Sequence, residues 1–184
     1  MARSVAEELL DIVRRAASER VPINADEAAS IERLLVELDR LPHPFSETAD
    51  PIHVTGSAIV AGPRGVVLLR HKRLGLWLQP GGHVDDGETP WDAALREAVE
   101  ETGLDAEFAE LGPDGVPPLI HVDVHPGGRG HTHLDLRYLV RAGDDDPDPP
   151  DDESQEIGWF DWPAAIERAS DDRLTALLEH LATG

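Results

Sequence analysis

The stretch that decides the fold is residues 81–104, which read GGHVDDGETPWDAALREAVEETGL. Thr89 and Pro90 predict the start of a helix, because a threonine hydroxyl caps free amide groups and proline suits the first helical position. The pattern continues to about Thr102, and Gly103 is expected to end the helix. The residues expected to form its buried stripe are Ala94, Leu95, Ala98, Val99 and Thr102.

Three glutamates in this predicted helix, Glu97, Glu100 and Glu101, stand at spacings of three and four. Such spacing puts their carboxylates on one side of the helix, with Cβ atoms within about 6 Å of each other. Like charges repel there, and the helix dipole disfavours anions near its carboxyl end. A bound divalent cation would reverse that balance, and hard oxygen ligands suit magnesium or manganese. For these three residues alone, a solvated acidic face is the alternative interpretation.

The neighbours of the three glutamates favour the metal interpretation. Gly81 and Gly82 allow a tight turn, and glycine lets a backbone carbonyl approach a metal closely. Arg96 can pair with Glu100 one turn later or with Glu88 before the helix.

From Gly82 to Leu104, this segment resembles a complete Nudix box. The matching positions are Gly82, Glu88, Arg96, Glu97, Ala98, Glu100, Glu101, Gly103 and Leu104. Ala98 is the smallest apolar residue that the pattern accepts. The flanking strands and the Trp159-Phe160 segment extend the likeness from about residue 52 to the C-terminus.

The resemblance implies an α/β Nudix fold, with a mixed β-sheet sandwiched between helices. It implies that Glu97 and Glu101 bind metal, that Glu100 shares a second ion, and that the Gly81 carbonyl is a further ligand. The expected cofactor is Mg²⁺ or Mn²⁺, with more than one ion per site. The residues that it implies as orienting support are Arg96, Glu88 and Gly82.

The resemblance also implies a catalytic base in a late loop, about six residues before the tryptophan of the final strand. Glu153 stands in that place before Trp159, at the end of an acidic loop over residues 144–152. Glu156 is the competitor, and Glu97 is the fallback base. The base is expected to take a proton from the water that attacks phosphorus.

Working outward, helices over about residues 4–19 and 26–41 predict an N-terminal hairpin (residues 1–45) before the Nudix domain (residues 51–184). The hairpin either packs on the domain, builds a dimer or covers the active site. Residues 163–181 are expected to be mostly helix. The expected strands lie near residues 52–61, 66–70, 107–111, 119–125, 131–141 and 157–162.

Polar residues alternate along the expected strand 131–141. His131, His133, Asp135 and Arg137 share one side of it, opposite an apolar side. This polar face has three possible roles. It lines the substrate cleft, with Arg137 or a histidine contacting phosphate, or it holds a separate transition metal on His131 and His133. The third alternative is a solvated face of the sheet without a specific function. Arg70 belongs to a basic cluster over residues 70–73, which either contacts substrate phosphates or is a solvated turn.

Composition narrows the class of partner. The chain has 37 acidic against 16 basic residues and a formal charge of -21, which disfavours binding to duplex nucleic acid. It has no cysteine, so no disulfide framework is possible. No stretch approaches the length of a membrane span, and we expect a cytoplasmic protein. A small phosphorylated molecule is the expected partner, with a homodimer as an open alternative.

The expected function is therefore metal-dependent hydrolysis of a diphosphate linkage in a nucleotide or a nucleoside diphosphate derivative. The alternative is a non-catalytic Nudix module that senses a nucleotide. Such modules usually lose glutamates of the box, and this chain keeps all of them. No motif identifies the substrate subfamily.

Overall fold

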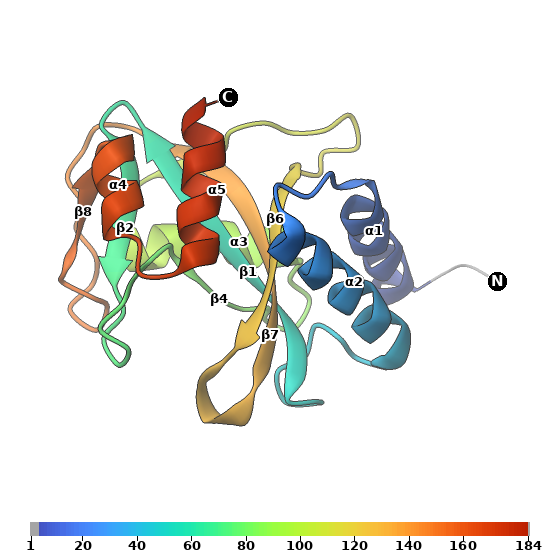
Figure 1. Ribbon diagram of the computed structural model, residues 1–184. Helices are drawn as coiled ribbons and strands as arrows, with labels where there is room; N and C mark the ends of the chain where they lie inside the picture. Colours follow the sequence, from blue (N-terminus) through green and yellow to red (C-terminus); the bar gives the residue numbers. More distant parts are fainter. Residues whose placement is uncertain (1–3, 184) are drawn as a thin grey trace.

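The structure is a computed structural model that describes residues 4–183. A mixed sheet forms its centre (Figure 1). The long strand β1 (Ile52–Gly62) pairs in parallel with β7 (Thr132–Ala142), and antiparallel with β2 (Gly65–Arg70) and β4 (Gly81–His83). Different parts of β1 thus have different antiparallel neighbours: residues 55–57 pair with β4, and residues 61–62 pair with β2.

The remaining strands extend the sheet on both sides. The strands β6 (Leu119–Pro126) and β5 (Ala106–Phe108) pair antiparallel with β7. The strands β3 (Trp77–Leu78) and β8 (Ile157–Phe160) pair antiparallel with β2. A short 3₁₀ turn, η1 (Gly128–Gly130), connects β6 to β7.

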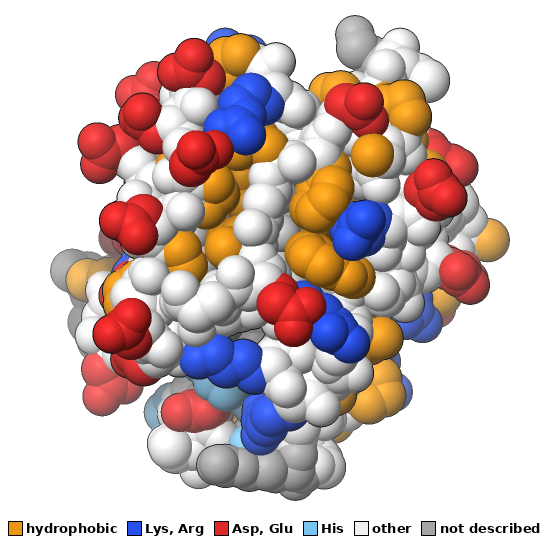
Figure 2. Space-filling view, turned by 90° about the vertical axis from the view of Figure 1, so that its left-hand side faces the viewer, with side chains coloured by type: hydrophobic (Ala, Val, Ile, Leu, Met, Phe, Trp, Pro, Cys, Tyr) orange, Lys and Arg blue, Asp and Glu red, His pale blue; other side chains and the backbone are white. Residues whose placement is uncertain are grey.

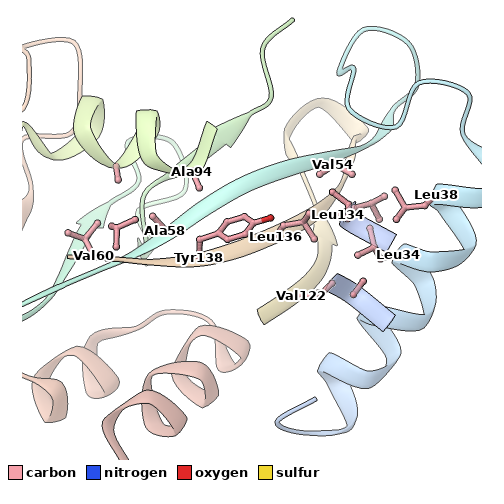
Figure 3. Close-up of a cluster of buried hydrophobic side chains, with 14 of the residues drawn as sticks. Leu34, Leu38, Val54, Ala58, Val60, Ala94, Val122, Leu134, Leu136 and Tyr138 are labelled. Carbon is pink, nitrogen blue, oxygen red and sulfur yellow. The ribbon is translucent and has the colours of Figure 1, made fainter. Parts of the chain in front are cut away.

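Helices cover both faces of the sheet, and alternate residues of β1 divide the core between them. Val54, Ala58 and Val60 pack with residues of α1 (Val5–Glu19), α2 (Ala25–Arg40) and α3 (Pro90–Thr102). Figure 3 shows Ala94 of α3 and Leu34 and Leu38 of α2 directed at these strands. Ile59 instead packs against α4 (Trp162–Arg168) and α5 (Asp172–Thr183).

The N-terminal hairpin packs on the sheet beside β6 (Figure 1). Leu34 and Leu38 are buried in the same core cluster as the strands. Glu27 is also buried, and its carboxylate accepts hydrogen bonds from Arg20 at 2.8 Å and from the Val122 amide at 3.2 Å. Of the three roles expected for the hairpin, packing on the domain is the one that these contacts show.

Residues 163–181 are mostly helical as expected, and one residue of the buried stripe of α3 has to be corrected. Residues 163–181 form two helices with a break at residues 169–171, where the Ser170 hydroxyl accepts a hydrogen bond from the Trp77 amide at 2.9 Å. Val99, expected in the buried stripe of α3, is 39% exposed, whereas Ala93 is buried. The buried face follows a row of residues spaced by four, and Val99 lies beside that row. Among residues 4–183, no helix is long and apolar enough to cross a bilayer.

Candidate active site

The helix α3 begins and ends where its sequence predicts. The Thr89 hydroxyl accepts a hydrogen bond from the Asp92 amide at 3.1 Å, and Pro90 occupies the first turn. Gly103 ends the helix with a φ of +68°, in the left-handed region that favours glycine. A Cβ at this position would also overlap the Asp148 carbonyl oxygen. These local signals fix the position of the three glutamates along the helix.

Two glycines of β4 contact the carboxylates through their backbone. A Cβ on Gly82 would overlap the Glu97 carboxylate, so that side chain lies directly against the Gly82 backbone. The Gly81 amide donates a hydrogen bond to Glu101 Oε2 at 2.9 Å. The edge of β4 and the carboxyl-terminal half of α3 therefore form the two sides of one acidic site.

Arg96 connects the acidic groups of the site. Its guanidinium donates hydrogen bonds to Glu88 Oε1 at 2.8 Å, to Glu97 Oε1 at 2.8 Å and to Glu100 Oε2 at 3.1 Å. A further bond at 3.0 Å reaches the His83 carbonyl oxygen on β4. Pairing with Glu88 and pairing with Glu100 were alternatives in the sequence, and the structure shows both.

The environment disfavours negative charge on two of the glutamates. Burial and, to a smaller extent, the neighbouring charges of Glu97, Glu153 and Glu100 raise the pKa of Glu101 to about 8, against the hydrogen bond from the Gly81 amide. Burial also raises the pKa of Glu97, although Arg96 opposes the shift. Glu88 behaves differently, because hydrogen bonds from Arg96 and the Asp85 amide outweigh its burial and lower its pKa. A divalent cation between Glu97 and Glu101 would stabilise both as anions.

Glu153 is close enough to the two partly buried carboxylates for its charge to raise the pKa of both Glu97 and Glu101. Its loop is fixed to β2 by the Ser154 hydroxyl, which donates a hydrogen bond to the Arg70 carbonyl oxygen at 2.7 Å. Glu156, the competing candidate for the base, instead forms an ion pair with Arg70 at 3.0 Å. Of these two acids, Glu153 is the one whose charge acts on the site.

The structure separates the other predicted residues from one another. Arg70 lies at the exposed end of β2, next to the loop that carries Glu153. Arg137 is 1% exposed, and its guanidinium donates hydrogen bonds to Asp123 at 2.9 Å and to Asp135 at 3.1 Å. This burial argues against the expected contact between Arg137 and a substrate phosphate.

Behind Gly81, the buried polar residues form a network that the sequence did not reveal. Asp135 accepts hydrogen bonds from the Thr55 and Ser57 hydroxyls, and Ser57 lies against Gly81. His131 and His133 belong to the neighbouring part of this face, where they lie beside His53 and His83. The only available signal was alternation along each strand, because the register between strands brings these residues together.

The oxygen atoms of this site suit a hard divalent cation. The carboxylates of Glu97 and Glu101 are partly buried and both contact the backbone of β4. Arg96 donates hydrogen bonds to Glu97 and to the more exposed Glu100. Magnesium and manganese prefer such oxygen ligands and usually share them with phosphate groups. The arrangement can therefore hold a cation next to a phosphorylated substrate.

Comparison with known proteins gives consistent matches. The model of the NUDIX domain family matches residues 51–178. Nudix hydrolase 25 from Arabidopsis thaliana is 33% identical over 112 residues, which are 53% of this chain and 64% of that protein. An RNA pyrophosphohydrolase from Agrobacterium fabrum is 32% identical over 126 residues, which are 58% of this chain and 74% of that protein.

The fold has matches among solved structures. A hydrolase of the NUDIX family from Clostridium perfringens superposes with a TM-score of 0.59 at 25% sequence identity. The match covers 70% of this chain and 97% of that one. The N-terminal hairpin precedes the region that the family model matches, and the chain spans less than two thirds of the Arabidopsis protein.

Proposed function

Because the chain belongs to the Nudix family, we propose that it hydrolyses a diphosphate linkage in a nucleotide or a nucleoside diphosphate derivative. The observation that carries this proposal is the pair of partly buried carboxylates, Glu97 and Glu101, that face the Gly81-Gly82 backbone. The Arg96 guanidinium donates hydrogen bonds to three acids of the site, which are Glu88, Glu97 and Glu100. The single positive charge of Arg96 does not balance the negative charges of these carboxylates, so the site suits an added divalent metal ion.

The chemistry divides between the cation and the side chains. When bound, Mg²⁺ or Mn²⁺ would neutralise phosphate charge and lower the pKa of a water molecule. Glu97, Glu100, Glu101 and the Gly81 carbonyl are the proposed ligands, and Glu88 and Arg96 hold them in position. Glu153 accepts the proton of the attacking water, with Glu97 as the second candidate for this step. The water oxygen bonds to one phosphorus, the bond from that phosphorus to the bridging oxygen breaks, and the other phosphate leaves.

The surroundings support a small phosphorylated substrate. Lys72 donates a hydrogen bond to the Asp152 carbonyl oxygen, so the basic cluster lies beside the loop that carries Glu153. Figure 2 shows one face of the molecule, with Lys and Arg side chains next to histidines in its lower part and scattered acidic side chains among apolar and uncharged ones elsewhere. The name of the Agrobacterium relative supports a pyrophosphate linkage. The charge of -21 disfavours long nucleic acids.

The test is a panel of nucleoside triphosphates, nucleoside diphosphate sugars and dinucleoside polyphosphates, incubated with Mg²⁺ and assayed for release of monophosphate or pyrophosphate. We expect turnover of at least one compound, and we expect a metal chelator to abolish this turnover. Glu101→Gln keeps the shape of the side chain and removes its charge, so turnover should fall about 100-fold or more. The matched control is Glu110→Gln, on an exposed residue, which should retain full activity. Tight binding of a nucleotide without turnover by the unmodified protein would contradict the proposal and favour a sensor.

A further inference from the structure

Four histidines from separate segments meet on one face of the sheet. His53 lies on β1, His83 at the end of β4, His133 on β7, and His131 immediately before β7. One ring nitrogen of each lies within 4.8 Å of those of the other three. The rings of His83, His131 and His133 have centroids 5.1, 5.1 and 5.3 Å from that of His53.

This cluster lies on the opposite side of β4 from the glutamates. Successive side chains of a strand point to opposite faces. Gly82 faces Glu97, so the adjacent His83 points to the other face. The strand register places His53 beside His133, and Thr55 beside His83, on that same face. The histidines and the glutamates are thus two separate groups that share one short strand.

We propose that His53, His83, His131 and His133 bind one transition-metal ion, with zinc as the expected ion, at a site distinct from the carboxylate site.

Hydrogen bonds already orient two of the rings as metal ligands. The Nδ1 atom of His53 lies 3.1 Å from the Asp50 carbonyl oxygen, and that of His83 lies 2.9 Å from Glu47 Oε2. Such contacts assign the proton to Nδ1 and leave the Nε2 lone pair free, as in most metal-bound histidines. The Nε2 atoms of both rings are buried without a hydrogen-bond partner. Buried polar atoms normally have a partner, and a metal ion would supply one to both.

The His133 ring has the space that a ligand needs. A Cβ on Gly127 would overlap the His133 ring, so glycine at this position makes room for it. His125 also contacts the His133 ring, but it does not belong to the four histidines whose ring nitrogens all lie within 4.8 Å of one another, so we leave it out of the ligand set.

The donor set selects the class of metal. Imidazole nitrogen suits zinc, copper, nickel and iron, whereas magnesium and manganese prefer oxygen. Zinc with four nitrogen ligands is tetrahedral, and Zn–N distances of about 2.0–2.1 Å put the nitrogens roughly 3.4 Å apart. The rings must close by little more than an ångström from their present separation of up to 4.8 Å. An ion here would connect β1, β4 and β7, and so support the strand that carries Gly81 and Gly82.

The site can be tested without measuring hydrolysis. Metal-free protein is titrated with Co²⁺, and Zn²⁺ binding is measured by equilibrium dialysis in excess Mg²⁺, which saturates carboxylate sites. We expect one equivalent of Zn²⁺ and the intense visible absorption of four-coordinate cobalt.

His131→Ala should lower the affinity for Zn²⁺ about 100-fold or more. Glu47→Ala, which removes the hydrogen-bond partner of His83, should lower the affinity for Zn²⁺ about 10-fold to 100-fold.

Two matched controls separate this site from other sources of binding. His180→Ala removes an exposed histidine on α5, and Glu101→Gln removes a carboxylate of the other site. Both should leave the cobalt spectrum and the zinc stoichiometry unchanged. The proposal is overturned if the unmodified protein gives no four-coordinate cobalt spectrum, or if Glu101→Gln abolishes Zn²⁺ binding and His131→Ala does not. The spectrum of the unmodified protein decides the matter even where a histidine variant fails to fold.

Discussion

At the scale of single residues, Arg96 shows how one side chain holds an acidic site together. Its planar guanidinium donates to Glu88, Glu97 and Glu100 and to the carbonyl of His83. These partners lie before the helix, on it and on β4, so the guanidinium joins three parts of the chain. A lysine would keep the charge, but its single ammonium group cannot reproduce this fork.

We therefore predict that Arg96→Lys lowers kcat/KM about 10-fold to 100-fold, because Glu97 and Glu100 lose their orientation. Steady-state kinetics with the best substrate of the panel would measure the loss, and circular dichroism would verify the fold. The control is Arg64→Lys, on an arginine that pairs with the exposed Asp146. Equal kcat/KM for Arg96→Lys and the unmodified protein would refute the positioning role.

Gly82 gives a second prediction at this scale. A methyl group there would overlap the Glu97 carboxylate, which must then move away from β4. The carboxylate is the flexible end of the Glu97 side chain and can move, so we expect Gly82→Ala to fold. Because Glu97 is displaced, we expect turnover to fall about 100-fold. Gly143→Ala is the matched control, since a Cβ at Gly143 meets nothing within 4 Å. Should Gly82→Ala turn over substrate normally, Glu97 does not act from the position described.

At the scale of elements, local chemistry made some of the molecule predictable. The bounds of α3 follow from Thr89, Pro90 and Gly103, whose effects depend on their immediate neighbours. The break near Ser170 was missed, because it depends on a contact with Trp77 on a distant strand. His53 and His83 were missed as partners of His131 for the same reason. Only the pairing of β1 with β4 and β7 brings them together.

The helical hairpin provides a prediction about stability. Leu34 of α2 is fully buried in the core cluster shared with the sheet, whereas Val36 on the same helix is 56% exposed. Leu34→Ala should lower the free energy of unfolding by about 2–5 kcal/mol, through lost burial and the cavity left behind. Val36→Ala should change it by less than about 1 kcal/mol. Urea denaturation of both variants measures the difference, and equal stabilities would show that the hairpin is not part of the cooperative core.

At the scale of the whole molecule, one face of the sheet changes character along its length. Toward α5 it is apolar, with Ile59 packed against Leu174 and Leu177. Farther along, the same face carries Asp135 and Arg137, and then the histidines. The sequence shows the alternation of each strand, but burial of charge depends on neighbouring strands. For this reason the polar side was predicted, and its closed ion-pair network was not.

Buried histidines on this face make the stability of the metal-free protein depend on pH. His121 is 1% exposed, and burial together with the charge of Arg137 lowers its pKa to about 4. In the unfolded chain a histidine has a pKa of about 6.5. Between these two pKa values the unfolded state binds a proton at His121 that the folded state does not bind. The contribution of neutral His121 to the free energy of unfolding is therefore complete above about pH 6.5 and is lost as the pH falls toward 4. Glu27, whose pKa is lowered, acts in the same direction at lower pH, whereas His125, whose pKa is raised, acts in the opposite one.

We predict that His121→Gln reduces the loss of unfolding free energy between pH 7.5 and pH 4.5 by on the order of 2 kcal/mol, because glutamine has no proton to gain. Urea denaturation at both pH values, in the presence of a chelator, measures this loss. The control is His180→Gln, since His180 is exposed and its replacement should leave the pH dependence unchanged. NMR titration of the His121 ring in the folded protein gives an independent readout, because a midpoint near 6.5 would show that burial does not keep this ring neutral. A variant with the full pH dependence would assign the effect to other groups, and the buried polar face would then contribute nothing to acid sensitivity through His121.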